Sequence, residues 1–258
     1  MKVVLFGATG MIGQAVLREC LVDPDVTAVL SIGRRPSGAQ HAKLRDIVHD
    51  DLIDVGAIEA QLAGYDACLF CLGSTSVGMT EAEYTRVTYD VAMAAATALS
   101  RQSPGMTFVF ISGRGTDASE QGKTMWARVK GKTENAIARL PFKATYMFRP
   151  GYIQPVHGEK SRTAWTRNTY LLAGWLYPLW KLLFPNYVST TEGLARAMLA
   201  VAKRGADKHV LEVRDINHVA GAVQVHDGSL QPGHDPLSLN RVADEMEADV
   251  FADKHKTK

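Results

Sequence analysis

Short apolar runs alternate with stretches of helical periodicity through the first 150 residues of the chain. The apolar runs predict six buried strands, at residues 2–6, 27–32, 44–48, 66–72, 106–111 and 144–148. The intervening stretches with the clearest helical spacing are residues 12–22, 80–99 and 124–139. The second of these opens with a capping box formed by Thr80 and Glu83, and its predicted buried face includes Val87. Strands that alternate with helices in this way predict a doubly wound parallel sheet of the α/β class, with right-handed crossovers.

The pattern changes after Pro155. Residues 170–184 are strongly apolar and aromatic, but the stretch is short for a membrane span and contains Pro178 and Lys181. Three interpretations stay open: a cap over the substrate crevice or a subunit contact, an element on a membrane surface, which its tryptophans would suit, or plain core. A helix at 190–201 and a strand at 209–213 then return to the main domain.

The pattern therefore predicts one domain over residues 1–215. Its cap-like insertion, at about 156–188, forms a small and mostly helical substrate region. Residues 216–258 are rich in His, Asp, Gly and Pro and have little periodicity, so we expect a loosely structured tail.

Three glycines follow the first strand. Gly7 allows a tight turn, Gly10 lets the backbone approach a pyrophosphate, and Gly13 lets the helix and the strand pack closely. The phosphates would lie on the free N–H groups at the start of the helix. A strand, a glycine turn and a helix in this order predict a Rossmann-type dinucleotide site. The contacts expected from the turn come from Gly7, Thr9, Gly10, Met11, Ile12 and Gly13.

Two arginines follow the second strand, where an acidic residue would hold the ribose 2′-hydroxyl of NAD. The chain has Arg34 and Arg35 at this place. A carboxylate would repel a 2′-phosphate, whereas guanidinium groups bind it in bidentate fashion. The pair favours NADP(H) over NAD(H) as cofactor, and the alternative is a solvated basic turn.

Two further turns follow predicted strands. Asp50 and Asp51 come after the third strand and either accept from the adenine amino group or cap the next helix. The turn after the fourth strand lies where ligand crevices form, so we expect it to flank the phosphate or the ribose of the cofactor. The residues of this turn are Cys71, Leu72, Gly73 and Ser74.

The composition argues against nucleic-acid-binding, disulfide-rich and secreted proteins. The 258 residues are 46% hydrophobic and 22% charged, with a net charge of +2, as in a soluble globular protein without a broad nucleic-acid surface. Cys68 and Cys71 spell C-x-x-C, but residues three apart on a strand point to opposite faces, so we expect no redox or metal site. The chain enters its first strand at once, which leaves no room for a signal peptide. We expect a cytoplasmic protein, with residues 170–184 as a candidate contact to a membrane surface or a subunit.

These motifs together resemble the short-chain dehydrogenase/reductase superfamily. The resemblance also rests on Ser112 after the fifth strand, on Lys130, and on the turn formed by Arg149, Pro150 and Gly151. More narrowly, the chain is similar to the atypical NAD(P)-binding, epimerase/dehydratase-like branch that includes the Tat-interacting oxidoreductase-like proteins. The resemblance covers about residues 1–215 and implies that the backbone around Pro150 and Gly151 lies near the nicotinamide carboxamide, in a cofactor-binding turn with Arg149.

The resemblance also implies a catalytic set. Ser112 would steady the substrate carbonyl or hydroxyl, and Lys130 would hold the nicotinamide ribose. The tyrosine that gives or takes the proton would stand four residues before the lysine, but the chain has Trp126 there. An indole does not ionise in the useful range, so Trp126 cannot act as the acid or base. The candidates for the missing proton donor are Tyr84, Tyr89, Tyr152 and a water relayed through Ser112 and Lys130.

Two functions of different classes follow. The first is an NADP-dependent oxidoreductase or epimerase/dehydratase that acts on a small, partly apolar substrate. The alternative is a non-catalytic NADPH-binding sensor or regulatory module that contacts a partner protein or a membrane surface.

Overall fold

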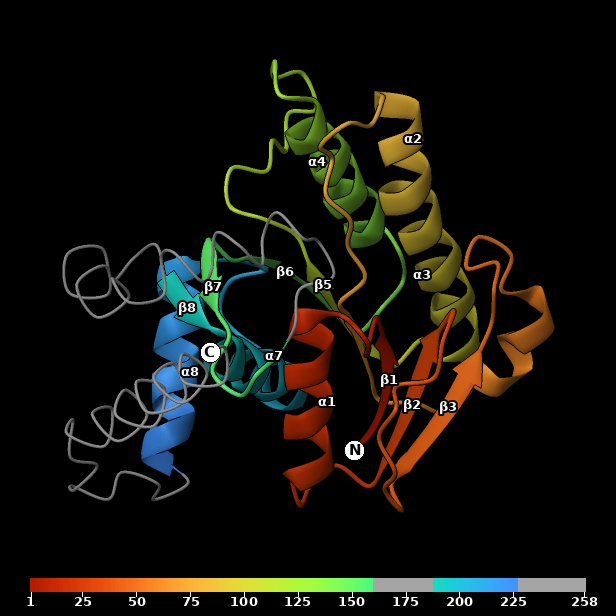
Figure 1. Cartoon of the computed structure of the whole chain (residues 1–258), viewed down its shortest axis with the longest axis vertical. Helices are drawn as coiled ribbons and strands as arrows, with labels where there is room; N and C mark the ends of the chain where they lie inside the picture. Colours follow the sequence, from red (N-terminus) through yellow and green to blue (C-terminus); the bar gives the residue numbers. More distant parts are fainter. Residues whose placement is uncertain (160–187, 227–258) are drawn as a thin grey trace, which may run out of the picture. The chain divides into compact units, whose positions relative to one another are not determined.

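A seven-stranded parallel sheet forms the centre of the protein (Figure 1). The computed structural model describes residues 1–159 and 188–226, with side chains as far as residue 223. The strand order is β3-β2-β1-β4-β5-β6-β9. The strands are β1 (Lys2–Phe6), β2 (Ala28–Gly33), β3 (Leu44–Val48), β4 (Ala67–Phe70), β5 (Thr107–Ile111), β6 (Ala144–Arg149) and β9 (Val210–Glu212). This order confirms the predicted α/β fold. It also creates a crevice at the carboxyl ends of β1 and β4, where the direction of winding changes.

Helices cover both faces of the sheet (Figure 1). They are α1 (Met11–Val22), α2 (Glu81–Thr85), α3 (Val91–Gln102), α4 (Met125–Ala138), α7 (Thr191–Arg204) and α8 (Val213–His226). The two faces follow from alternation along β1, because Leu5 packs with α1 and α7 whereas Phe6 packs with α3. Both cores are apolar, as parallel strands that are buried on two faces require.

The two cysteines of the C-x-x-C sequence lie on opposite faces of the sheet. Cys68 belongs to the core beneath α3, and Cys71 to the core beneath α1. Both are free thiols, and burial raises the pKa of each. This arrangement confirms that the two cysteines pack in the core on opposite faces of the sheet.

The helix expected over residues 80–99 is divided by a π-helical turn, η2 (Arg86–Asp90), between α2 and α3. The predicted capping box is present, since the Thr80 hydroxyl accepts from the backbone N–H of Glu83 and the Glu83 carboxylate accepts from that of Thr80. A wide π turn shifts the helical register. The prediction that Val87 lies on the buried face is therefore wrong, because Val87 is exposed and Thr88 is buried in its place.

Two short strands, β7 (Tyr152–Gln154) and β8 (Val188–Thr190), pair in parallel as a second small sheet. They flank residues 160–187, which lie outside the described residues together with the aromatic stretch 170–184. The interpretations of that stretch and of the cap therefore stay predictions. In the described part of the chain, no helix is long and apolar enough to cross a membrane.

The expected start of a loose tail at residue 216 is wrong. Helix α8 begins at Val213 and continues to His226, and residues 1–223 form one compact unit. Val213, Ile216 and Ala220 are buried at helical spacing, so this helix docks through a narrow apolar face. Residues 227–258 lie outside the described residues.

Candidate cofactor and active site

The glycine turn connects β1 to α1 through two close backbone approaches. Gly7 has a φ of +88°, and a Cβ there would lie 2.8 Å from the backbone of Cys71 and Leu72. A Cβ at Gly13 would lie 2.0 Å from the carbonyl oxygen of Gly7. The packing of the turn against β4 and α1 therefore requires glycine at both positions.

The start of α1 offers free N–H groups. Gly10 is the N-cap and provides no side chain to the first turn, which also carries no acidic residue. The amide of Gly10 itself donates to Gly7 O at 2.9 Å. Free amides at a helix N-terminus attract anions, so the residues around Thr9, Met11 and Ile12 fit the pyrophosphate of a dinucleotide.

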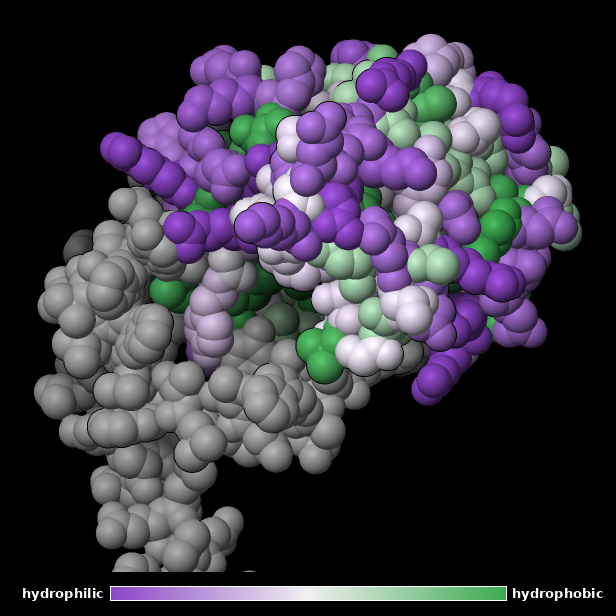
Figure 2. All heavy atoms as spheres, turned by 90° about the horizontal axis from the view of Figure 1, so that it is seen from above, coloured by the Kyte–Doolittle hydropathy of each residue, from purple (hydrophilic) through white to green (hydrophobic). Residues whose placement is uncertain are grey.

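Two neighbouring cavities extend from this turn, and they share Arg34, Leu52 and Leu72. The first is also lined by Gly7, Thr9 and Arg35 of the predicted site. The second is also lined by Asp50, Asp51, Gly73 and Ser74. The structure thus brings the glycine turn, the arginine pair, the acidic pair and the turn after β4 to one continuous surface. On the face shown in Figure 2, most described residues are hydrophilic and hydrophobic ones show in small areas.

Arg86 of η2 also lines the second cavity, and the sequence analysis missed it. Within residues 1–159 and 188–223, the side chains of Arg34, Arg35 and Arg86 make no ion pair or hydrogen bond. Unpaired guanidinium groups around a cavity suit an anionic ligand. The sequence carries no signal for Arg86, because its position depends on the π turn that it begins.

The two interpretations of Asp50 and Asp51 can now be separated in part. Neither residue caps a helix, because the next helix is the 3₁₀ helix η1 (Gly56–Leu62), and Asp54 Oδ1 accepts from the first amide of η1. Asp51 Oδ1 accepts from the backbone N–H of Ile53 at 2.9 Å and closes a local turn. The Asp50 side chain, by contrast, makes no hydrogen bond in the described residues and faces the cavity.

Ser112 lies directly after β5, as expected, and is buried. Its amide donates to Phe148 O, and the amide of Arg114 donates to Pro150 O, so the turns after β5 and β6 run side by side. The Ser112 hydroxyl lies 2.9 Å from Thr116 Oγ1, which donates to Gly113 O at 2.7 Å. Thr116 is a further residue that the sequence analysis missed.

Lys130 of α4 points to the same end of β5. Its Nζ donates to Ile111 O at 3.2 Å and lies 5.3 Å from the centre of the Phe110 ring. Burial lowers the pKa of Lys130 to about 8, against the opposing effect of Glu134. Lys130 is therefore a buried amine beside Ser112 and not a surface lysine.

Trp126 lies one turn before Lys130 and is half-buried. Its indole covers the turn after Ser112, since a Cβ built at Gly113 or at Gly115 would lie 3.8 or 3.6 Å from the ring. The two glycines leave room for a large aromatic side chain at this place. Trp126 is thus part of the site wall and supplies no proton.

The sequence predicts that Arg149 belongs to the cofactor-binding turn, but its side chain does not extend into the crevice. Its guanidinium forms a two-bond contact with the buried Glu134, at 3.0 and 2.5 Å, and a third contact with Glu212 at 3.3 Å. A buried carboxylate needs such a partner, so the Arg149 guanidinium is held by Glu134 and Glu212 at the edge of the sheet. Only the backbone of the turn through Pro150 and Gly151 lies beside the Ser112 turn.

Each of the three tyrosines considered as proton donors lies against residues other than Ser112 and Lys130. Tyr84 is buried in the helix layer, and burial raises its pKa. The Tyr89 ring lies 4.6 Å from Lys132 Nζ. The Tyr152 hydroxyl donates to Gln154 Oε1 at 3.0 Å. In the part of the chain that is described, no cluster of three potential metal ligands is present.

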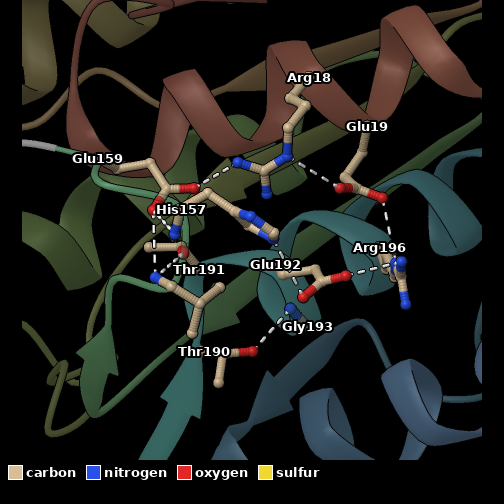
Figure 3. Close-up of polar contacts among 10 residues, drawn as sticks. Arg18, Glu19, His157, Glu159, Thr190, Thr191, Glu192, Gly193 and Arg196 are labelled. Carbon is tan, nitrogen blue, oxygen red and sulfur yellow. Dashed lines mark hydrogen bonds and ion pairs between the residues drawn. The ribbon is translucent and has the colours of Figure 1, made fainter. Parts of the chain in front are cut away.

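An ion pair joins the half-buried Arg18 of α1 to the buried Glu159 (Figure 3). Arg18 Nη1 contacts Glu159 Oε1 at 2.5 Å, across 141 residues of sequence. The other Glu159 oxygen accepts from the backbone N–H of Val156 and of His157, at 3.2 and 2.9 Å. Burial alone would raise the pKa of Glu159, but the hydrogen bonds from Arg18 and His157 outweigh it and lower the pKa to about 2.

The same network continues to α7 (Figure 3). Glu19 accepts from Arg196 Nε at 3.1 Å, and Arg196 also pairs with Glu192 at 2.7 Å. These contacts tie the middle of α1 to the first turns of α7. They hold the helix that begins at the glycine turn in a fixed position.

Comparisons with known proteins support NAD(P)H binding. Residues 7–146 match the family model described as NAD(P)H-binding. The mitochondrial protein fmp52 of Emericella nidulans is 31% identical over 170 residues, which cover 63% of this chain and 71% of the relative. Protein HTATIP2 of Rattus norvegicus is 26% identical over 223 residues, which cover 84% of this chain and 88% of the relative.

Solved structures show the same fold. The Bordetella bronchiseptica enzyme WbmF in complex with NAD+ aligns with a TM-score of 0.61 at 15% identity, over 89% of this chain and 79% of that one. A UDP-N-acetylglucosamine 4-epimerase from Methanobrevibacter ruminantium aligns with a TM-score of 0.58 at 15% identity, over 87% and 81% of the two chains. The family match, the sheet order and the glycine turn together lead to one conclusion: the chain belongs to the NAD(P)H-binding family.

Proposed function

We propose that the chain is an NADP-dependent oxidoreductase, or an epimerase/dehydratase, that acts on a small and partly apolar substrate. The observation that carries the proposal is the position of Lys130, whose buried amine lies at the carboxyl end of β5 beside Ser112. A buried amine is costly to keep unless it is used. Its place next to a hydroxyl and a cofactor crevice suits chemistry at the reactive end of a nicotinamide.

The residues of the crevice fit NADP(H). The amides at the start of α1 would hold the pyrophosphate, and Arg34, Arg35 and Arg86 would hold the 2′-phosphate. Asp50 would accept from the adenine amino group. A nicotinamide bound there supplies hydride transfer, while Ser112 and Lys130 orient the substrate and the ribose.

The test is a panel of small aldehydes and ketones with NADPH, followed by absorbance. We expect turnover by the wild type and its loss in both Ser112→Ala and Lys130→Met. The matched control is Lys132→Met, on the same helix but exposed, which should keep full activity. Turnover that survives loss of both Ser112 and Lys130 would contradict the proposal.

A non-catalytic NADPH sensor is the second candidate, and Trp126 at the tyrosine position favours it. NADPH binding without turnover of any substrate in the panel, together with a partner or lipid contact that changes with NADPH, would support the sensor. A contact that does not depend on the nucleotide would count against it.

We also propose a reducing compartment, because Cys20, Cys68 and Cys71 are all buried free thiols. The cytoplasm meets that condition, and so does the interior of mitochondria, which the names of the fungal relatives give for them. Microscopy of the tagged chain would decide between the two.

A further inference from the structure

The hydrogen of the Ser112 hydroxyl is already used. Thr116 has one hydroxyl hydrogen, and Thr116 donates it to Gly113 O at 2.7 Å. In the 2.9 Å contact between the two hydroxyls, Ser112 must therefore be the donor and Thr116 the acceptor. Ser112 is left with an oxygen that can accept a hydrogen bond, but without a hydrogen for a substrate.

The other groups that could supply a proton at this place are also accounted for. Trp126 has an N–H that does not ionise in the useful range. The Tyr152 hydroxyl donates to Gln154, and Tyr84 is buried in the helix layer. The Tyr89 ring lies 4.6 Å from Nζ of the exposed Lys132. A carbonyl substrate beside Ser112 therefore needs its proton from another residue.

Lys130 is the remaining group with protons to give. An ammonium group carries three N–H donors, and in the described residues one of them is used, toward Ile111 O. That carbonyl belongs to the residue directly before Ser112, so the amine and the hydroxyl lie at the same end of β5. The indole of Trp126, one helical turn away, covers the adjoining turn at Gly113 and Gly115.

The surroundings of the amine make it able to release a proton near neutral pH. From β5 it faces the Phe110 ring and a backbone carbonyl, neither of which is charged. From α4 itself, Glu134 is the charged group that acts on it, and Glu134 is paired with Arg149. Burial therefore dominates and lowers the pKa of Lys130 to about 8, which is close to the working range of a general acid.

We propose that Lys130 is the general acid of this site and takes the place of the tyrosine that Trp126 replaces. The inference rests on the proposed function in its oxidoreductase form. In carbonyl reduction, a bound NADPH would supply the hydride from its nicotinamide C4–H bond and become NADP+, while the new C–H bond forms and the C=O π bond breaks. The N–H bond of the Lys130 ammonium breaks, and its proton forms the O–H bond of the alcohol. The neutral amine then takes a proton from water, and Ser112 Oγ accepts a hydrogen bond from the new hydroxyl.

The test compares Lys130→Arg with the wild type. Arginine keeps the positive charge, but it does not release its proton in the accessible pH range. We expect kcat of the wild type to fall as pH rises through about 8. We expect Lys130→Arg to lose about 100-fold or more in kcat and to lose this pH dependence, while the Kd for NADPH stays within about threefold. Lys132→Met, which removes an exposed lysine two residues away, is the control for both measurements.

A second measurement does not need turnover. NMR titration of lysine labelled at the ε position, with Lys130→Arg used to assign the signal, should show one amine that titrates near pH 8. Turnover and a pH profile kept by Lys130→Arg, or a Lys130 amine that titrates above pH 10, would overturn the inference but leave the proposed function intact. Absence of turnover by the wild type would overturn both.

Discussion

Lys130 of α4 donates to the carbonyl oxygen of Ile111 in β5 across 3.2 Å, at the residue that precedes Ser112. This contact fixes a buried amine at the carboxyl end of the central strands, where the fold forms its cofactor crevice. The neighbouring helix turn places Trp126 over the loop that follows Ser112. The site therefore places the serine and the lysine that the resemblance to short-chain dehydrogenases implies beside an aromatic side chain.

Removal of the buried amine should stabilise the protein. The pKa of Lys130 is about 8 in the folded chain and 10.5 when unperturbed, so the unfolded chain binds more protons between these pH values. Burial therefore lowers stability below pH 8, and this cost disappears as pH rises past 10.5. We expect Lys130→Met to raise the free energy of unfolding by about 1–3 kcal/mol at pH 7, measured by urea unfolding.

The pH dependence of the stability gain distinguishes the loss of the buried charge from an improvement in packing. The gain of Lys130→Met should shrink between pH 8 and pH 10, whereas Lys132→Met should change stability little at either pH. A gain of the same size at both pH values would show that the charge of the amine is not the cause. A variant with lost activity and higher stability would be a stability–function trade-off at a single residue.

Gly13→Ala should disrupt the glycine turn. The new Cβ would lie 2.0 Å from Gly7 O, a backbone atom that cannot move aside without displacing β1 or α1. We expect a loss of about 3 kcal/mol or more in urea unfolding, together with loss of NADPH binding. Gly105→Ala is the matched control, because a Cβ there meets nothing within 4 Å, and it should stay within about 0.5 kcal/mol. A stable Gly13→Ala protein that binds NADPH normally would contradict the structure of the turn.

The sequence was sufficient to predict the sheet and the glycine turn because both are local. Apolar strands, helical spacing and glycines at fixed offsets are visible in the residues themselves. The prediction that Asp50, Gly73 and Arg34 lie around one crevice followed from the rule that strand ends meet at one edge of a parallel sheet.

The features that escaped prediction depend on partners far away in sequence or on irregular backbone. The motif around Arg149 predicts a cofactor contact, but the Arg149 guanidinium binds Glu134 and Glu212. Arg86 enters the cavity only because of the π turn that divides the helix. The start of α8 was missed because its polar residues obscured a narrow apolar face.

The ion pair between Arg18 and Glu159 should contribute to stability above about pH 4.5. Because the pKa of Glu159 falls from 4.5 to about 2 on folding, its contribution is present above pH 4.5 and is lost as pH falls toward 2. We expect Glu159→Gln to lower the free energy of unfolding by about 1–3 kcal/mol at pH 7, since it leaves the Arg18 guanidinium without its carboxylate.

The control for this ion pair is an exposed one. Glu81 pairs with Arg128 at 2.6 Å, but its side chain is 52% exposed, against 3% for Glu159. Glu81→Gln should therefore cost about 1 kcal/mol or less. Equal losses in the two variants would show that the burial of Glu159 does not matter. A Glu159→Gln loss that persists unchanged near pH 2 would show that the charge of Glu159 is not the cause.

The most direct test of the central claim is calorimetric titration with NADPH and with NADH. We expect NADPH to bind about 10-fold to 100-fold more tightly, because each charged contact to the 2′-phosphate contributes about 1.5–3 kcal/mol. The double variant Arg34→Ala and Arg35→Ala should remove most of this preference and leave NADH binding unchanged, and Arg86→Ala should remove part of it. Arg139→Ala, an exposed arginine outside the crevice, is the control. Equal affinity for the two nucleotides, unaltered by loss of the arginines, would contradict the account.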